Sequence, residues 1–213
     1  FYLNLRTTFL RRVVRFFRRN YFMSKGLKLS EILVTVLIAV IFAIIYNLWW
    51  LPYNLAQVAG IHLEQLTYGI WFMAAIVAYL IIPKPGIALI AEFAAGAGET
   101  IVMGKFDIPT IVYAILQGLA CEIVFAIFKY KSRSLMVAML AGLVTALVSF
   151  PVDYFYGYLN EVAGWNLLLF IIFRAISGIV LSGILSYLIV KALDQTGVTK
   201  LFRPASQKDY DNL

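Results

Sequence analysis

The sequence is short of the residues that soluble enzymes, disulfide-linked domains and metal proteins use. Only 14% of its 213 residues are charged, and it has one cysteine and one histidine. A soluble domain carries roughly 25% charged residues, a disulfide framework needs pairs of cysteines, and metal sites draw mostly on several histidines, cysteines and carboxylates. These shortages exclude a soluble enzyme and a disulfide scaffold. We also predict no metal site, no cofactor and no catalytic residue.

Two catalytic patterns are missing as well. The sequence has no GxxxxGKS or GxxxxGKT phosphate-binding loop, so it cannot hydrolyse ATP in the manner of P-loop proteins. Its only histidine, His62, has no evident serine partner, which disfavours an intramembrane hydrolase that uses such a pair. We therefore predict a protein without enzymatic activity of its own.

Apolar residues, in contrast, are abundant. Hydrophobic residues make up 62% of the chain, and the mean hydropathy is +0.87. A membrane-spanning helix needs about 20 consecutive apolar residues. Six runs with few or no charges approach or exceed that length: 29–50, 66–82, 86–103, 108–128, 135–158 and 165–193. The predicted fold class is therefore an all-α integral membrane protein with six transmembrane helices.

The basic residues predict how the chain is oriented. If both termini lie on one side of the membrane, sixteen of the 18 Lys and Arg residues lie there too, and Lys105 and Arg174 are the exceptions. Cytoplasmic loops carry an excess of Lys and Arg, so both termini are predicted to be cytoplasmic. The chain then divides into a basic arm over residues 1–27, a six-helix membrane domain over 28–193 and a polar cytoplasmic tail over 194–213.

The arm is predicted to form a basic amphipathic helix. Apolar residues recur in it at helical spacing, and the opposite face carries Arg11, Arg12, Arg15, Arg18 and Arg19. Such a helix lies in the membrane interface against anionic lipid headgroups. Nucleic-acid binding is the competing interpretation of these arginines, and six apolar runs in the same chain argue against it. Membrane lipid is therefore the predicted partner of the arm, and nucleic acid is not.

The acidic residues are distributed the other way. Four of the 11 Asp and Glu residues fall on the predicted cytoplasmic side, which gives that side a formal charge of +12. The other seven fall within the spans or outside the membrane, together with only Lys105 and Arg174, and their balance is −5. A site in that region should attract cationic solutes or solutes rich in hydrogen-bond donors.

Several polar side chains fall inside the predicted spans, where each charge costs about 2.5 to 3.5 kcal/mol on insertion scales. They are Asn47, Glu92, Glu99, Gln117, Glu122, Asp153 and Arg174. One interpretation is a set of interior hydrogen bonds in which Arg174 pairs with Asp153 or Glu99. Because one arginine cannot pair with three glutamates, at least two carboxyl groups remain to be protonated, to face water or to meet a ligand. We favour a ligand or proton site.

Aromatic residues gather at the predicted outer ends of the spans, among them Tyr46, Trp49, Trp50, Tyr53, Tyr68, Trp71 and Tyr113. An interfacial aromatic belt explains part of this enrichment. Carboxylates and amides are not part of such a belt, and aromatic faces beside Glu99, Gln117 and Asn47 suit a flat or cationic solute. In the first outer loop, His62 and Glu64 either close over this pocket or are solvated loop residues.

Three stretches, taken in order, resemble one family. They are 68–74 (YGIWFMA), 84–92 (KPGIALIAE, continuing to Glu99) and 117–122 (QGLACE). Together with the basic start, the six short spans and the small pair Ala39 and Ala43, they resemble the substrate-binding S component of an energy-coupling factor (ECF) transporter. More narrowly, the three stretches resemble its YkoE group, which is linked to thiamine and its hydroxymethylpyrimidine precursor. The resemblance covers about residues 28–193.

The resemblance implies a membrane subunit without its own ATPase, in a prokaryotic cell membrane. It would work with an ECF transmembrane coupling protein and two ATP-binding subunits, and it would tip in the membrane to carry its ligand inward. Ala39 and Ala43 would be where the first helix docks on the coupling protein. Small residues at this spacing let another helix approach closely.

The ligand that the resemblance implies is thiamine or its pyrimidine moiety. A carboxylate such as Glu99 or Glu122 would pair with the exocyclic amine and, if protonated, with the ring nitrogen beside it, and Glu64 and Glu92 are the next candidates. The rings of Trp71 and Tyr68 would stack on the ligand, and the amides of Gln117 and Asn47 would fix its orientation. The excess of acidic residues favours thiamine, because hydroxymethylpyrimidine lacks the positively charged thiazolium.

Two other interpretations stay open at this point. The chain could be a stand-alone, proton-coupled carrier for a cationic or heteroaromatic solute, with Glu92, Glu99 and Glu122 as the proton relay. Alternatively, it could be an assembly subunit without a ligand, in which the buried acidic residues are simply paired. Uptake by the isolated chain, or the absence of binding to any cationic metabolite, would separate these from the first interpretation.

Overall fold

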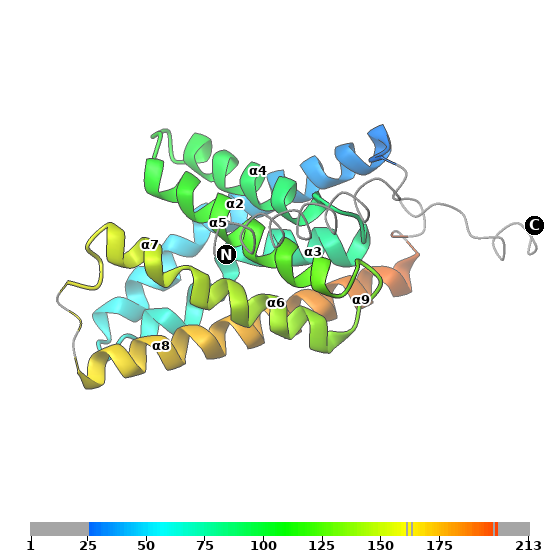
Figure 1. The fold of residues 1–213 in the computed structure, drawn as a ribbon. Helices are drawn as coiled ribbons and strands as arrows, with labels where there is room; N and C mark the ends of the chain where they lie inside the picture. The colour runs from blue at the N-terminus through cyan, green and yellow to red at the C-terminus, as the bar shows by residue number, and fades with distance from the viewer. Residues whose placement is uncertain (1–25, 161, 163, 198, 200–213) are drawn as a thin grey trace, which may run out of the picture.

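The computed structural model describes residues 26–160, 162, 164–197 and 199, and every regular element within them is a helix (Figure 1). In chain order these are α2 (Leu29–Val58), the 3₁₀ helix η1 (Leu63–Phe72), α3 (Met73–Ile81), α4 (Ile87–Val102), α5 (Ile108–Ile127), α6 (Leu135–Val148), α7 (Phe150–Phe155), α8 (Trp165–Ser177), the π-helix η2 (Gly178–Leu185) and α9 (Ser186–Thr196). The all-helical prediction is thus confirmed for the described residues.

Five continuous helical stretches are long and apolar enough to cross a membrane. They are Leu29–Val58, Leu63–Ile81, Ile108–Ile127, Leu135–Phe155 and Trp165–Thr196. The remaining predicted span corresponds to α4, which has 16 residues and is about 24 Å long at 1.5 Å per residue. The chain is therefore a multi-pass membrane protein, and its sixth crossing stays a prediction.

The two terminal segments of the sequence lie almost wholly outside the described residues. Of the arm over 1–27, only Gly26 and Leu27 are described, and the described part of the tail ends at Thr199. The amphipathic arm helix, the polar tail and the cytoplasmic placement of both termini consequently stay predictions.

Small residues pack helix α4 closely between α2 and α5. A Cβ atom added to Gly98 of α4 would lie 2.7 Å from the Cβ of Ala43 in α2, and one added to Gly96 would lie 2.5 Å from the Cβ of Ala114 in α5. Neither distance leaves room for a larger side chain. Close approach at small residues is the usual way in which helices associate where both are surrounded by lipid.

Ala43 belongs to this internal packing and Ala39, one turn earlier on α2, is buried as well, which argues against the prediction that they dock on a coupling protein. Their exposed fractions are 1% and 3%, so the chain itself covers them. A docking surface needs accessible side chains, and on α2 the accessible face carries larger apolar residues: Leu33, Leu37, Val40, Ile41, Ile44 and Leu48. The spacing of two alanines predicts a close helix contact, but not which helix makes it.

The N-terminal ends of α2 and α4 are joined by a partly buried ion pair. Lys84, in the loop before α4, places its Nζ 2.7 Å from Oε1 of Glu31, and the backbone N–H of Lys28 donates to Oε2 of the same carboxylate at 2.8 Å. Glu31 is 2% exposed. It therefore stabilises the start of α2 and also fixes the α3–α4 loop against it.

Candidate functional site

A cavity of about 430 Å³ opens among the second half of α2, η1, α4, the start of α5 and α8. That volume lies within the range of roughly 300–1,000 Å³ that small organic ligands occupy. Five acidic side chains line it, from Glu64, Glu92, Glu99, Asp107 and Asp153, together with a single cation, Arg174. The predicted acidic pocket therefore exists, and its walls combine carboxylates with aromatic rings.

The 3₁₀ geometry of η1 builds one wall of the cavity. Side chains three residues apart eclipse one another in a 3₁₀ helix, because it has 3.0 residues per turn. Gln65, Tyr68 and Trp71 are spaced in this way along η1 and all line the cavity. In an α-helix the same three residues would rotate away from a common line. The 3₁₀ geometry therefore aligns one amide and two aromatic rings in a single row, which we call the ridge of η1 (Gln65, Tyr68 and Trp71).

Gly69 allows this ridge to sit deep in the molecule. Its N–H donates to Oγ of Ser177 at 2.7 Å, and a Cβ atom at position 69 would collide with the backbone carbonyl of Ser177. Any larger residue would push η1 away from the end of α8. This explains the glycine in the sequence Tyr68-Gly-Ile-Trp71.

Glu99 is held by two tryptophans. Trp50 from α2 donates its indole N–H to Oε1 of Glu99 at 2.9 Å, and Trp71 from η1 donates to the same oxygen at 3.1 Å. The residue is 2% exposed and lines the cavity. Its other oxygen, Oε2, accepts no hydrogen bond from any described residue. A carboxylate oxygen has two acceptor positions, so Oε2 is left for a ligand or for water.

Aromatic rings surround this carboxylate. The ring centroid of Trp71 lies 5.1 Å from that of Trp50, 5.1 Å from that of Tyr53 and 5.8 Å from that of Tyr68. These separations are typical of tilted and edge-to-face contacts. A carboxylate with a free oxygen inside a cluster of aromatic faces is suited to a cation or to a ring that carries N–H donors.

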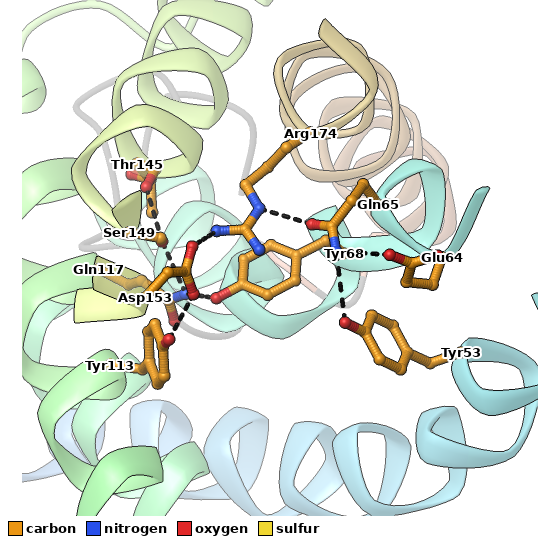
Figure 2. Close-up of polar contacts among 10 residues, drawn as sticks. All are labelled: Tyr53, Glu64, Gln65, Tyr68, Tyr113, Gln117, Thr145, Ser149, Asp153 and Arg174. Atoms are coloured by element: carbon orange, nitrogen blue, oxygen red, sulfur yellow. Dashed lines mark hydrogen bonds and ion pairs between the residues drawn. The ribbon is translucent and has the colours of Figure 1, made fainter. Parts of the chain in front are cut away.

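Arg174 of α8 is the centre of a second polar group in the cavity wall (Figure 2). It forms a buried ion pair with Asp153, which also accepts the hydroxyl of Tyr113. Its Nε donates to Oε1 of Gln65 at 2.8 Å. The guanidinium carbon lies 3.8 Å from the ring centroid of Tyr68. Of the two partners that the sequence left open for Arg174, the structure selects Asp153.

Two amides extend this network to neighbouring elements. Gln65 donates to the hydroxyl of Tyr53 at 3.3 Å and to Oε1 of Glu64 at 3.1 Å. Gln117 of α5 donates to the hydroxyl of Tyr68 at 3.4 Å and to Oγ of Ser149 at 3.2 Å. Figure 2 shows these contacts joining α2, η1, α5, α6, α7 and α8. The network holds the rings and amides of the cavity in place.

Glu92 borders the cavity but is engaged in the fold. The hydroxyl of Tyr46 lies 3.1 Å from both of its carboxylate oxygens, and the backbone N–H of Ala75 donates to Oε2 at 3.0 Å. The same Tyr46 oxygen accepts the N–H of Ala74 at 3.0 Å. These N–H groups belong to the first turn of α3, where a helix has no internal partners for them. Glu92 and Tyr46 thus cap α3 at its junction with η1.

Glu122 caps a different helix, outside the cavity. It accepts the backbone N–H groups of Gly86 and Leu89, at the start of α4. A carboxylate at a helix N-terminus satisfies free N–H groups and complements the helix dipole. The structure therefore places this candidate binding residue in helix capping.

Among the other candidate residues, Glu64 lines the cavity and Asn47 does not. Glu64 is 5% exposed and its Oε1 lies 3.4 Å from Nδ1 of His62, which also lines the cavity. The predicted binding residues that the structure brings together around the cavity are Glu64, Tyr68, Trp71, Glu92, Glu99 and Gln117.

Gln65 was not among the candidate residues, and Trp50 and Tyr53 were noted only as members of an aromatic cluster. Gln65 lies before the apolar run that begins at residue 66 and is therefore easily assigned to a loop. Its spacing of three from Tyr68 and of six from Trp71 is a usable signal only if the segment is known to be a 3₁₀ helix.

Comparisons with known proteins give consistent matches. A family model described as "ABC-type cobalt transport system, permease component" matches residues 30–148. The chain is 37% identical over 176 residues to a Bacillus subtilis (strain 168) protein named as the HMP/thiamine permease protein YkoE; the match covers 82% of this chain and 88% of that protein. The crystal structure of an S-component of an ECF transporter superposes with a TM-score of 0.77 at 34% identity, covering 82% of this chain and 89% of that one.

Proposed function

Because the chain belongs to the S components of ECF transporters, in the YkoE group, we propose that it binds thiamine, or the hydroxymethylpyrimidine part of thiamine, for import. The cavity beside Glu99 is the proposed binding site. The similar protein from Bacillus subtilis carries HMP and thiamine in its name, and the chemistry of the cavity in this chain supports a ligand of that kind.

The single observation that carries the proposal is the environment of Glu99. Two indole N–H groups hold one oxygen of its carboxylate, and the other oxygen accepts nothing from the described residues. A buried carboxylate with an unused acceptor is costly unless something binds to it. Thiamine offers both a positive ring and an amine that donates hydrogen bonds, so it can satisfy that oxygen.

The remaining walls suit the rings of such a ligand. Trp50, Tyr53, Tyr68 and Trp71 all line the cavity, and each cation–π contact that a ligand makes with such a ring contributes about 0.5 to 2 kcal/mol. The cavity of about 430 Å³ is large enough for an organic molecule with two rings, whereas a bare metal ion would leave most of it empty. We therefore favour the whole vitamin over its pyrimidine alone, and over the cobalt in the description of the matching family model.

Energy for import would come from other chains. Membership of the family implies partners, and we propose an ECF transmembrane coupling protein with two ATP-binding subunits in a prokaryotic plasma membrane. We further propose that α4 is the sixth membrane crossing, since it packs along both α2 and α5, which are themselves long enough to span. The charge distribution supports a cytoplasmic position for both termini.

The proton-coupled carrier is less well supported. Its relay requires Glu92, Glu99 and Glu122 to exchange protons, yet Glu92 and Glu122 cap α3 and α4 and contact backbone N–H groups instead. Uptake of thiamine by liposomes that contain only this chain, driven by a pH gradient, would favour the carrier. Uptake that depends on ATP and the partner chains would favour the S component.

Titration of the purified protein in detergent tests the proposal directly. Thiamine should change the tryptophan fluorescence with saturation below the micromolar range, because Trp50 and Trp71 flank Glu99. Glu99→Gln should weaken binding by about tenfold or more, since hydrogen bonds to a charged group contribute about 1.5 to 3 kcal/mol. It should change the free energy of unfolding by less than about 1 kcal/mol, because an amide oxygen still accepts both indoles.

Glu122→Gln is the matched control, because it makes the same chemical change outside the cavity. Its affinity for thiamine should equal that of the wild type. A wild-type protein without a saturable response, or a Glu99→Gln variant with unchanged affinity, would contradict the proposal.

A further inference from the structure

The cavity has two ends that differ in whether their ionisable side chains are paired with a group of opposite charge. The first, which we call the cage end, is formed by Trp50, Tyr53, Trp71 and Glu99. The second, the paired end, is formed by Gln65, Tyr68, Gln117, Asp153 and Arg174. All nine residues line the same cavity. The two ends adjoin, since Trp71 and Tyr68 are neighbours on the ridge of η1 with their ring centroids 5.8 Å apart.

The cage end contains an acidic group that no cation of the described residues balances. Glu99 has hydrogen-bond donors but no cationic partner among the described residues, and its Oε2 is unused. The tryptophan faces beside it can add cation–π attraction. A positive charge is therefore favoured here twice, by the carboxylate and by the rings.

The paired end is electrically neutral and already contains a cation. Arg174 and Asp153 compensate each other within the wall. The guanidinium also covers one face of the Tyr68 ring, with its central carbon 3.8 Å from the ring centroid. A second cation at this end would be repelled by Arg174 and would find the Tyr68 ring already polarised by a positive group. A neutral ring meets neither penalty.

The paired end nevertheless offers one donor and one acceptor. Among the described residues, Nη2 of Arg174 donates to no partner and Oε1 of Gln117 accepts from none, although both side chains are buried, with exposed fractions of 1% and 2%. The other nitrogens of the two side chains are engaged with Asp153, Gln65, Tyr68 and Ser149. What remains fits a ring edge that has one acceptor nitrogen and one amino group.

We propose that the cavity binds a two-ring cation in one orientation, with its positive ring at the cage end and its neutral aminopyrimidine-like ring at the paired end. For thiamine, the thiazolium would face Glu99, the exocyclic amine would donate to Oε1 of Gln117, and a ring nitrogen would accept from Arg174. This orientation rests on the proposed function. It differs from the pairing of Glu99 with the amine that the resemblance implies, and it makes Gln117 and Arg174 specificity-determining residues.

The test compares ligands of nearly the same size. Thiamine, an analogue with a neutral ring in place of the thiazolium, and an analogue without the exocyclic amine are titrated into the wild type, Glu99→Gln and Gln117→Met. Such a cycle isolates the coupling between one ligand group and one side chain. Gln195→Met is the matched control for Gln117→Met, since Gln195 is exposed near the end of α9.

Each substitution is expected to remove the preference for one ligand group and to leave the preference for the other. The wild type should prefer thiamine over each analogue by about tenfold or more. In Glu99→Gln the preference over the neutral-ring analogue should shrink to within about threefold, while the preference over the analogue without the amine persists. Gln117→Met should show the converse, and Gln195→Met should match the wild type.

Other outcomes separate the two proposals. If Glu99 couples to the amine and Gln117 to the positive ring, the orientation is reversed and this inference is wrong. Equal coupling of each side chain to both ligand groups, or no coupling at all, would overturn it as well. If the wild type binds none of the three ligands, the proposed function fails instead.

Discussion

The cavity and the N-terminal ends of helices α2 and α4 both contain buried or partly buried carboxylates, but these carboxylates have different partners. At the helix ends, Glu31 and Glu122 accept backbone N–H groups from the first turns of α2 and α4. In the cavity, Glu99 accepts two indole N–H groups on one oxygen, and its other oxygen accepts nothing from the part of the chain that the structure describes. Glu92 borders the cavity and nevertheless belongs with the first group, because it caps α3.

This difference shows how to interpret an acidic residue in a membrane helix. A helix N-terminus presents free N–H groups that need an acceptor, and a nearby carboxylate satisfies them within the fold. A carboxylate far from any helix start has no free backbone N–H groups beside it. Its oxygens can therefore accept hydrogen bonds from a solute. Substitutions of the first kind should change stability, and substitutions of the second kind should change affinity.

The largest effect on stability is expected for Arg174→Met. It would leave Asp153, which is 3% exposed, without its cation and Gln65 without its donor. Breaking a buried ion pair from one side costs about 3 to 5 kcal/mol. Chemical denaturation in detergent micelles would measure the loss. The double variant with Asp153→Asn should recover part of it, and a single variant as stable as the wild type would show that Asp153 is not held by Arg174.

A smaller loss is expected for Glu92→Gln. The amide oxygen can still accept the N–H of Ala75, but the NH₂ group would face only the hydroxyl of Tyr46, whose oxygen already accepts the N–H of Ala74. An unsatisfied buried group costs about 1 to 3 kcal/mol. The same denaturation experiment measures it. A variant of normal stability with greatly weakened thiamine binding would instead move Glu92 into the group of ligand-binding residues.

The smallest effect is expected for Glu122→Gln. Its carboxylate is partly exposed, and loss of a helix-capping group costs about 0.5 to 2 kcal/mol. Denaturation should show a modest loss of stability, and titration should show wild-type affinity for thiamine. Weakened binding without any loss of stability would indicate that Glu122, like Glu99, contacts the solute.

The sequence predicts the helices well because apolar length is a local property. The predicted run at 108–128 corresponds to α5 at Ile108–Ile127 almost residue for residue, and the run at 165–193 corresponds to α8, η2 and α9 in succession. The change from a 3₁₀ to an α-helix at Phe72 is not visible in that signal. It depends on Glu92 and Tyr46, which come from other helices to cap the new α-helical turn.

Partners between elements were predicted less well. The sequence left Arg174 with two possible carboxylates and, by resemblance, assigned Ala39 and Ala43 to a coupling protein. The structure pairs Arg174 with Asp153 and packs Ala43 against α4. Spacing along one helix places residues on a common face, but it contains no information on what packs against that face. Gln65 was missed for the same reason, since its role depends on Arg174, 109 residues further along the chain.

By itself, then, the sequence determined an all-helical, multi-pass membrane protein with an excess of acidic groups away from its basic termini, and its motifs indicated the family. Composition, apolar run length and charge distribution are sufficient for this, because the lipid bilayer imposes them on any chain that crosses it. Only the tertiary structure decided which carboxylates accept backbone N–H groups within the fold. That choice depends on whether a helix start from another part of the chain reaches a given glutamate, and none of the described helices begins at Glu99.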